Sequence, residues 1–250
     1  MLVDIRTIPR NWIFKRSGHA TLGTCALLLL GAFALFSVVS EPGGNTSVDR
    51  IAYQVTDWLV TGPVHRVMHP VIDNAGDVGA PGACIYLALI LATVLVVQRR
   101  WLAAGLVLVV LILLSAIELV VRAQLGTMSL GELPRFVVAP RTEHFFAIGP
   151  YPSGHVARTM LLASIEVAML PRALRRIGAV AAIVTAGLCG LSRIHGGQHT
   201  GSDVVGGILL GAGLGLLWAA VLPAVGMLER QMWSARWLST LASTKSASHR

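Results

Sequence analysis

Six long apolar runs alternate with shorter polar segments along the chain, and each run is predicted to form a helix. An α-helix needs about 20 mostly apolar residues to cross the hydrocarbon core of a bilayer. The Pro-Gly-Gly-Asn sequence after the first run is typical of a helix end. The pattern therefore predicts an all-α integral membrane bundle of six transmembrane helices, at about residues 19–40, 81–98, 102–121, 154–170, 177–191 and 204–225.

The segment at 46–79 has a different pattern. Ile51, Val55 and Trp58 fall on one helical face, and apolar residues recur in the same way after Gly62–Pro63. This spacing predicts two short amphipathic helices on the bilayer surface. They would either pack over the bundle or help a lipid to enter it, and the pattern leaves both roles open.

Charge is scarce in this sequence. Charged residues make up 13 % and hydrophobic residues 54 % of the chain, whereas soluble domains carry roughly 25 % charged residues. The formal net charge of +8 comes from basic residues dispersed beside apolar runs. This placement favours contact with the lipid bilayer and argues against nucleic acid as a partner.

Residues with metal or redox chemistry are few and scattered. His65 and His69 are four residues apart, but no third ligand is evident, so a solvated helix face is favoured over a metal site. Cys25, Cys84 and Cys189 have no paired spacing and are interpreted as small core residues. The sequence therefore predicts no metal, no disulfide and no cofactor.

The basic residues also predict the orientation in the membrane. With six spans, the basic N-terminal segment at 1–18 and the links Arg99–Arg100 and Arg172–Arg176 share one side, and the positive-inside rule makes that side the cytoplasm. Residues 19–225 would then form a plasma-membrane domain, and residues 226–250 a cytoplasmic tail that is first amphipathic and then disordered. The first run is interpreted as an uncleaved span, because no small-residue cleavage site follows it.

A polar island at Ser192–Asp203 lies between the last two apolar runs. Polar groups at a membrane boundary are costly unless they satisfy one another or do chemistry. If a helix starts near His199, Asp203 lies on the same face and can accept a hydrogen bond from one ring nitrogen, which leaves the other as a nucleophile. Arg193 offers a planar fork of donors for a phosphate, and His195 is interpreted as a solvated loop residue.

A second polar island, Tyr151–His155, precedes the fourth apolar run and has the pattern of a helix start. Ser153 is a good N-cap residue, and Gly154 lets backbone amides approach a ligand. Helix N-termini bind anions, and His155 could donate a proton to a departing oxygen. Both islands fall on the same predicted side, so we expect them to meet in a phosphate-handling site at the outer face.

These islands carry a family resemblance. The tetrad Pro152–His155 and the spacing Ser192, Arg193, five residues, His199, three residues, Asp203 resemble the second and third motifs of the type-2 phosphatidic acid phosphatase superfamily. This superfamily contains membrane lipid phosphatases and polyprenyl diphosphatases, and the vanadium haloperoxidases are soluble relatives. The resemblance implies a six-span membrane enzyme that hydrolyses a lipid phosphate or polyprenyl diphosphate without a metal.

The resemblance also implies a role for each residue. His199 would attack phosphorus and form a phosphohistidine, with Asp203 orienting it. His155 would protonate the leaving oxygen and then activate water. Positioned donors carry most of the catalysis of phosphoryl transfer, because the transferred group spreads its charge over three oxygens. By resemblance, these donors would be Arg193, Ser153 and Gly154.

The chain departs from the family's first motif, which has Lys, six residues and then Arg-Pro at the outer end of the third run. Arg122 is the best stand-in for the Lys and is predicted to bind phosphate, although Glu118 could pair with it instead. Arg135 and Arg141 could supply a second cation. Two alternatives stay open. One is a lipid phosphotransferase that uses the same site, and the other, favoured by the missing motif, is a catalytically impaired protein that binds or transports lipid phosphates. The head group, the chain length and the oligomeric state are not predicted.

Overall fold

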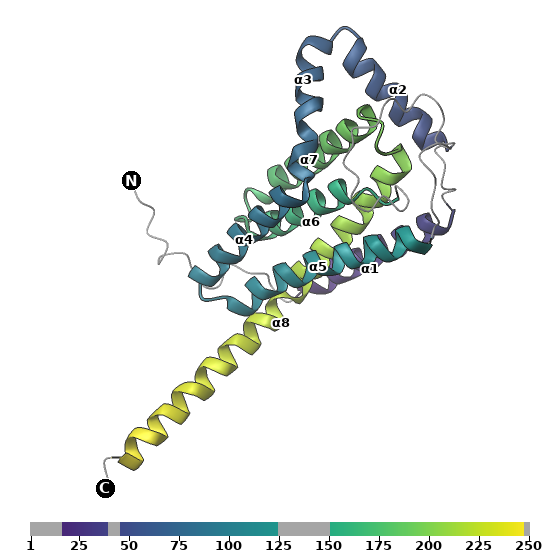
Figure 1. The fold of residues 1–250 in the computed structure, drawn as a ribbon. Helices are drawn as coiled ribbons and strands as arrows, with labels where there is room; N and C mark the ends of the chain where they lie inside the picture. The colour runs from purple at the N-terminus through teal and green to yellow at the C-terminus, as the bar shows by residue number, and fades with distance from the viewer. Residues whose placement is uncertain (1–16, 40–45, 125–150, 248–250) are drawn as a thin grey trace.

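The computed structural model describes residues 17–39, 46–124 and 151–247 of the 250-residue chain. Within these ranges all regular elements are helices (Figure 1). The N-terminal basic residues and the loop residues Arg135 and Arg141 lie outside the described residues. The elements are α1 (Ser17–Val39), α2 (Ser47–Thr61), α3 (His65–Ala75), the 3-10 helix η2 (Gly76–Gly79), α4 (Pro81–Val97), α5 (Trp101–Gln124), α6 (Gly154–Met169), α7 (Arg175–His195) and α8 (Gly201–Ala247).

Each of the six predicted apolar runs forms a helix, but their lengths differ. Four of the described helices, α1, α5, α7 and α8, are long and apolar enough to cross a membrane, and α3, η2 and α4 together make a fifth candidate, bent by 63°. The 16 residues of α6 rise only about 24 Å, which is less than the roughly 30 Å of a hydrocarbon core. The chain is thus a multi-pass membrane bundle, and six full spans stay a prediction.

Close packing of α6 against α8 brings the two polar islands together. Gly207, Gly211 and Gly215 form a stripe on α8, and a Cβ at each would collide with the backbone or side chains of α6. Small residues let helix backbones approach closely in membranes, where burial of apolar surface does not drive association. On the outside of the bundle, α1, α4, α5 and α7 expose many large apolar side chains, as a lipid-facing surface requires.

The two ends of the bundle are chemically different. The starts of α6 and α8 and the ends of α5 and α7 meet at one end, which the segment at 46–79, comprising α2, α3 and η2, covers (Figure 1). We call this segment the covering segment. The basic links Arg99–Arg100 and Arg172–Arg176 connect helices at the opposite end.

Helix α8 continues to Ala247, well beyond the boundary near residue 225 that the sequence indicated, and projects from the bundle in Figure 1. Pro223 lies inside it without ending it. Six residues later, the buried Glu229 accepts a hydrogen bond from the Leu102 amide at 2.6 Å. This contact caps α5 and holds α8 against the bundle past the expected boundary.

Candidate active site

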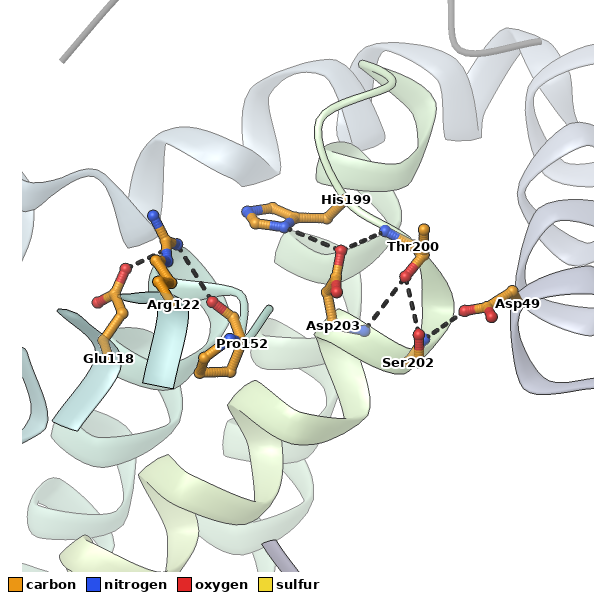
Figure 2. Close-up of polar contacts among 8 residues, drawn as sticks. All are labelled: Asp49, Glu118, Arg122, Pro152, His199, Thr200, Ser202 and Asp203. Atoms are coloured by element: carbon orange, nitrogen blue, oxygen red, sulfur yellow. Dashed lines mark hydrogen bonds and ion pairs between the residues drawn. The ribbon is translucent and has the colours of Figure 1, made fainter. Parts of the chain in front are cut away.

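His199 and Asp203 are paired, although not as members of one helix. His199 Nδ1 lies 3.3 Å from Asp203 Oδ2, but α8 begins only at Gly201. Asp203 Oδ2 also accepts the Thr200 amide at 2.8 Å, and the Thr200 hydroxyl receives the Asp203 amide at 3.4 Å (Figure 2). Asp203 therefore closes a capping box at the start of α8 and contacts the imidazole from that fixed position.

This contact determines which ring nitrogen of His199 is available for chemistry. With the carboxylate at Nδ1, that nitrogen carries the proton and Nε2 keeps its lone pair. Both side chains are almost fully enclosed, at 9 % and 5 % exposure. In Figure 2 the ring points away from α8, toward the side of the site where Arg122 and Pro152 lie.

The two polar islands are joined directly. The Ser153 amide donates to the Asp203 carbonyl at 2.9 Å. Just before it, the buried Tyr151 places its hydroxyl 3.1 Å from Ser37 Oγ, and its ring stacks on Phe33 with centroids 6.1 Å apart. Tyr151 thus anchors the second island to α1, and Ser153 anchors it to the start of α8.

His155 lies in the first turn of α6. The guanidinium groups of Arg193, Arg158 and Arg122 and the imidazole of His199 are its polar neighbours. The structure therefore brings His155, His199 and Arg193 to one site, although they come from three helices or their ends.

Several buried donors in this site have no hydrogen-bond partner among the described residues. They are Arg122 Nε, Ser153 Oγ, Arg158 Nε and Arg193 Nε. An unsatisfied buried donor is costly, and functional sites are a common reason for one. Three guanidinium groups and a hydroxyl beside the N-terminus of α6 form an arrangement suited to a multiply charged oxyanion.

Glu118 organises two of these cations. Its carboxylate, buried at the end of α5, is 2.8 Å from Arg122 Nη2 and 2.9 Å from Arg158 Nη1. Arg122 Nη2 also donates to the Pro152 carbonyl at 3.1 Å. The ion pair that the sequence offered as an alternative for Arg122 is thus formed, while its Nε has no partner among the described residues.

Gly154 packs against a side chain that the sequence did not predict. A Cβ at this position would collide with the Glu118 carboxylate. Glycine here is therefore required for the approach of Glu118 to the start of α6, and not only for the approach of a ligand.

The covering segment contributes contacts that the sequence did not predict. Asp49 Oδ1 accepts the Ser202 amide at 2.7 Å and so satisfies a free amide at the start of α8 (Figure 2). Burial raises the pKa of the Asp49 carboxyl, but hydrogen bonds from Thr46 and Ser202 outweigh burial and hold this pKa below its ordinary value. The pattern Thr46-x-x-Asp49, a capping box for α2, was the available signal in the sequence.

Two glycines of η2 pack directly on catalytic candidates. A Cβ on Gly76 would overlap the Arg193 guanidinium and Ser192 Oγ, and a Cβ on Gly79 would lie 2.5 Å from the His155 carbonyl oxygen. The bare backbone of η2 therefore fits over both residues. This spacing of two glycines was visible in the sequence but has no unique meaning there.

Fold and site together define a class: a helical membrane protein with an imidazole–carboxylate pair beside a cluster of anion donors. Residues 128–226, which contain both polar islands, match the model of the PAP2 superfamily. This match supports the resemblance to the type-2 phosphatidic acid phosphatases that the motifs predicted.

The fold is similar to a known structure described as the first transmembrane PAP2-type phosphatidylglycerolphosphate phosphatase from Bacillus subtilis. The TM-score is 0.59 at 22 % identity, over 77 % of this chain and 93 % of that chain. No curated protein matches the chain significantly.

Proposed function

We propose that this protein is a membrane phosphatase that hydrolyses a lipid phosphate or polyprenyl diphosphate through a phosphohistidine. The observation that carries the proposal is the His199–Asp203 pair beside four buried donors that lack partners among the described residues. A negatively charged phosphoryl group would satisfy those donors. The similar Bacillus subtilis structure, described as a phosphatidylglycerolphosphate phosphatase, supports a lipid phosphomonoester as the first substrate to test.

In the proposed reaction, Nε2 of His199 forms a bond to the terminal phosphorus while the bond from that phosphorus to the leaving oxygen breaks. The leaving oxygen belongs to the lipid part of a lipid phosphate or to the polyprenyl monophosphate of a diphosphate. His155 donates a proton to that oxygen and later takes one from the water that attacks the phosphohistidine. Inorganic phosphate leaves and His199 is regenerated. Arg193, Ser153, Gly154 and the Nε of Arg122 would hold the phosphoryl oxygens.

We further propose that the site faces the outer side of the plasma membrane, with both termini in the cytoplasm. The separation of the site from the two basic links, which connect helices at the opposite end of the bundle, supports this orientation because basic links favour the cytoplasm.

The test is phosphate release by purified protein from phosphatidic acid, phosphatidylglycerol phosphate and undecaprenyl diphosphate. We expect release from at least one of them, no release by His199→Ala, and normal release by His65→Ala, an exposed histidine of α3. A radioactive phosphoryl label on the protein should resist alkali and be lost in acid. Transfer of the label to a lipid acceptor would indicate a phosphotransferase, and binding of every substrate without turnover would indicate a binding protein.

A further inference from the structure

Three potential metal ligands meet outside the active site, at the junction of α3 and α7. His69 Nδ1 lies 3.2 Å from Asp73 Oδ2, and His195 Nε2 lies 3.5 Å from Asp73 Oδ1. The ligand atoms of all three residues lie within 4.8 Å of one another. His195, which the sequence suggested to be a solvated loop residue, thus supplies the third ligand that His69 lacked there.

The two nitrogen–oxygen separations, one to each oxygen of Asp73, are close to those between ligands of one cation. Ligand atoms arranged tetrahedrally at about 2.0–2.1 Å from an ion are roughly 3.3–3.4 Å apart. The two imidazoles are also held edge to face, with centroids 5.3 Å apart, so their nitrogens converge on the same carboxylate.

We propose that His69, Asp73 and His195 bind a divalent first-row transition cation of the Zn²⁺ class. Two imidazole nitrogens and one carboxylate favour such ions, whereas Mg²⁺ and Ca²⁺ prefer all-oxygen sites. The site is exposed, so it is open to exchange with solution, and water would complete the coordination.

The position of the site gives the cation a structural role. His195 ends α7 two residues after Arg193, and α3 leads directly into η2, whose Gly76 packs on Arg193. A bound ion would tie α3 to the end of α7 and hold η2 over the site. None of the three ligands has a part in the proposed phosphoryl transfer, so this inference goes beyond that function.

The test is calorimetric titration of the full chain with ZnCl₂, after chelator treatment and with an affinity tag that contains no histidine. We expect one ion per chain, and no matching binding of MgCl₂. Asp73→Asn and His195→Ala should each weaken zinc binding by more than the roughly 10–100-fold typical of outer-shell partners. His65→Ala and Asp77→Asn change exposed residues of the same covering segment outside the ligand set and should bind as the wild type does.

One further measurement, thermal unfolding in the presence of zinc, makes the result decisive. Zinc should raise the midpoint of thermal unfolding in the wild type and in His199→Ala, but not in Asp73→Asn. Retention in His199→Ala separates this proposal from the proposed phosphatase activity. Absence of binding at millimolar ZnCl₂, or binding that is unchanged in both ligand variants, would overturn the site and leave the cluster as an ordinary contact between α3 and α7.

Discussion

Two regions of the molecule meet at the site and contribute to it in different ways. The segment at 151–203 supplies the imidazoles, the carboxylate at His199 and most of the anion donors. The covering segment supplies none of these groups, but its Asp49 caps the start of α8 and its Gly76 and Gly79 pack on Arg193 and His155. One region carries the proposed chemistry, and the other fixes its geometry.

This difference explains why the segment at 151–203 can be recognised from its sequence, whereas the covering segment cannot. Phosphoryl transfer needs particular side chains at particular spacings, so the two polar islands form a pattern. The covering segment acts largely through backbone approach and a helix cap, which many sequences provide. The match to the superfamily, at residues 128–226, accordingly excludes the covering segment.

The largest effect is expected in the segment that carries the chemistry. His155→Ala removes the proposed proton donor, and general acid–base catalysis contributes typically about 10²–10⁴-fold. Turnover measured by phosphate release should fall by this factor, while the thermal unfolding midpoint stays near that of the wild type. A loss of less than tenfold would mean that the proton comes from another group.

Gly76→Ala tests the covering segment without replacing any residue that is proposed to bind phosphate or to take part in catalysis. The added Cβ would displace the Arg193 guanidinium, and small misplacements of a binding group can cost up to about 10²-fold. We expect kcat/KM to fall by about 10- to 100-fold, mainly through KM. The control is Gly82→Ala, because a Cβ there meets nothing within 4 Å. Equal activity of the two variants would show that η2 does not position Arg193.

The sequence was informative where residue identity carries the chemistry or where apolar length is decisive. It predicted the six helices and the meeting of the two islands, because charge and hydropathy place the islands on one side. The start of α8 at Gly201 was not predicted, since a capping box can bring Asp203 to His199 without a shared helix face. The roles of Asp49, Glu118 and Gly76 depend on tertiary contacts between distant segments, which local patterns do not encode.

Asp49→Asn should have a smaller effect than Gly76→Ala. It weakens the cap on the Ser202 amide, and helix caps contribute about 1 kcal/mol, so kcat/KM should fall by up to about tenfold. Because the pKa of Asp49 is lowered in the fold, the wild-type cap is present at neutral pH and is lost as the pH falls through that lowered value. Unfolding midpoints measured against pH should therefore converge for wild type and variant in acid. Asp57→Asn, at an exposed position of α2, is the matched control.

The smallest effect is expected for Arg122→Ala, at the position where the chain departs from the first motif of the superfamily that it resembles. Arg122 already binds Glu118 and the Pro152 carbonyl through Nη2, so only part of its guanidinium is free for phosphate. Arg158 still pairs with Glu118 in the variant, which limits the cost of a buried charge. We expect kcat/KM to fall several-fold and the unfolding midpoint to fall slightly, with Arg172→Ala, an exposed arginine at the opposite end, unchanged in both. Wild-type kinetics with a lowered midpoint would assign Arg122 to the Glu118 ion pair alone, and the phosphoryl group would then depend on Arg193 and Arg158 for its cations.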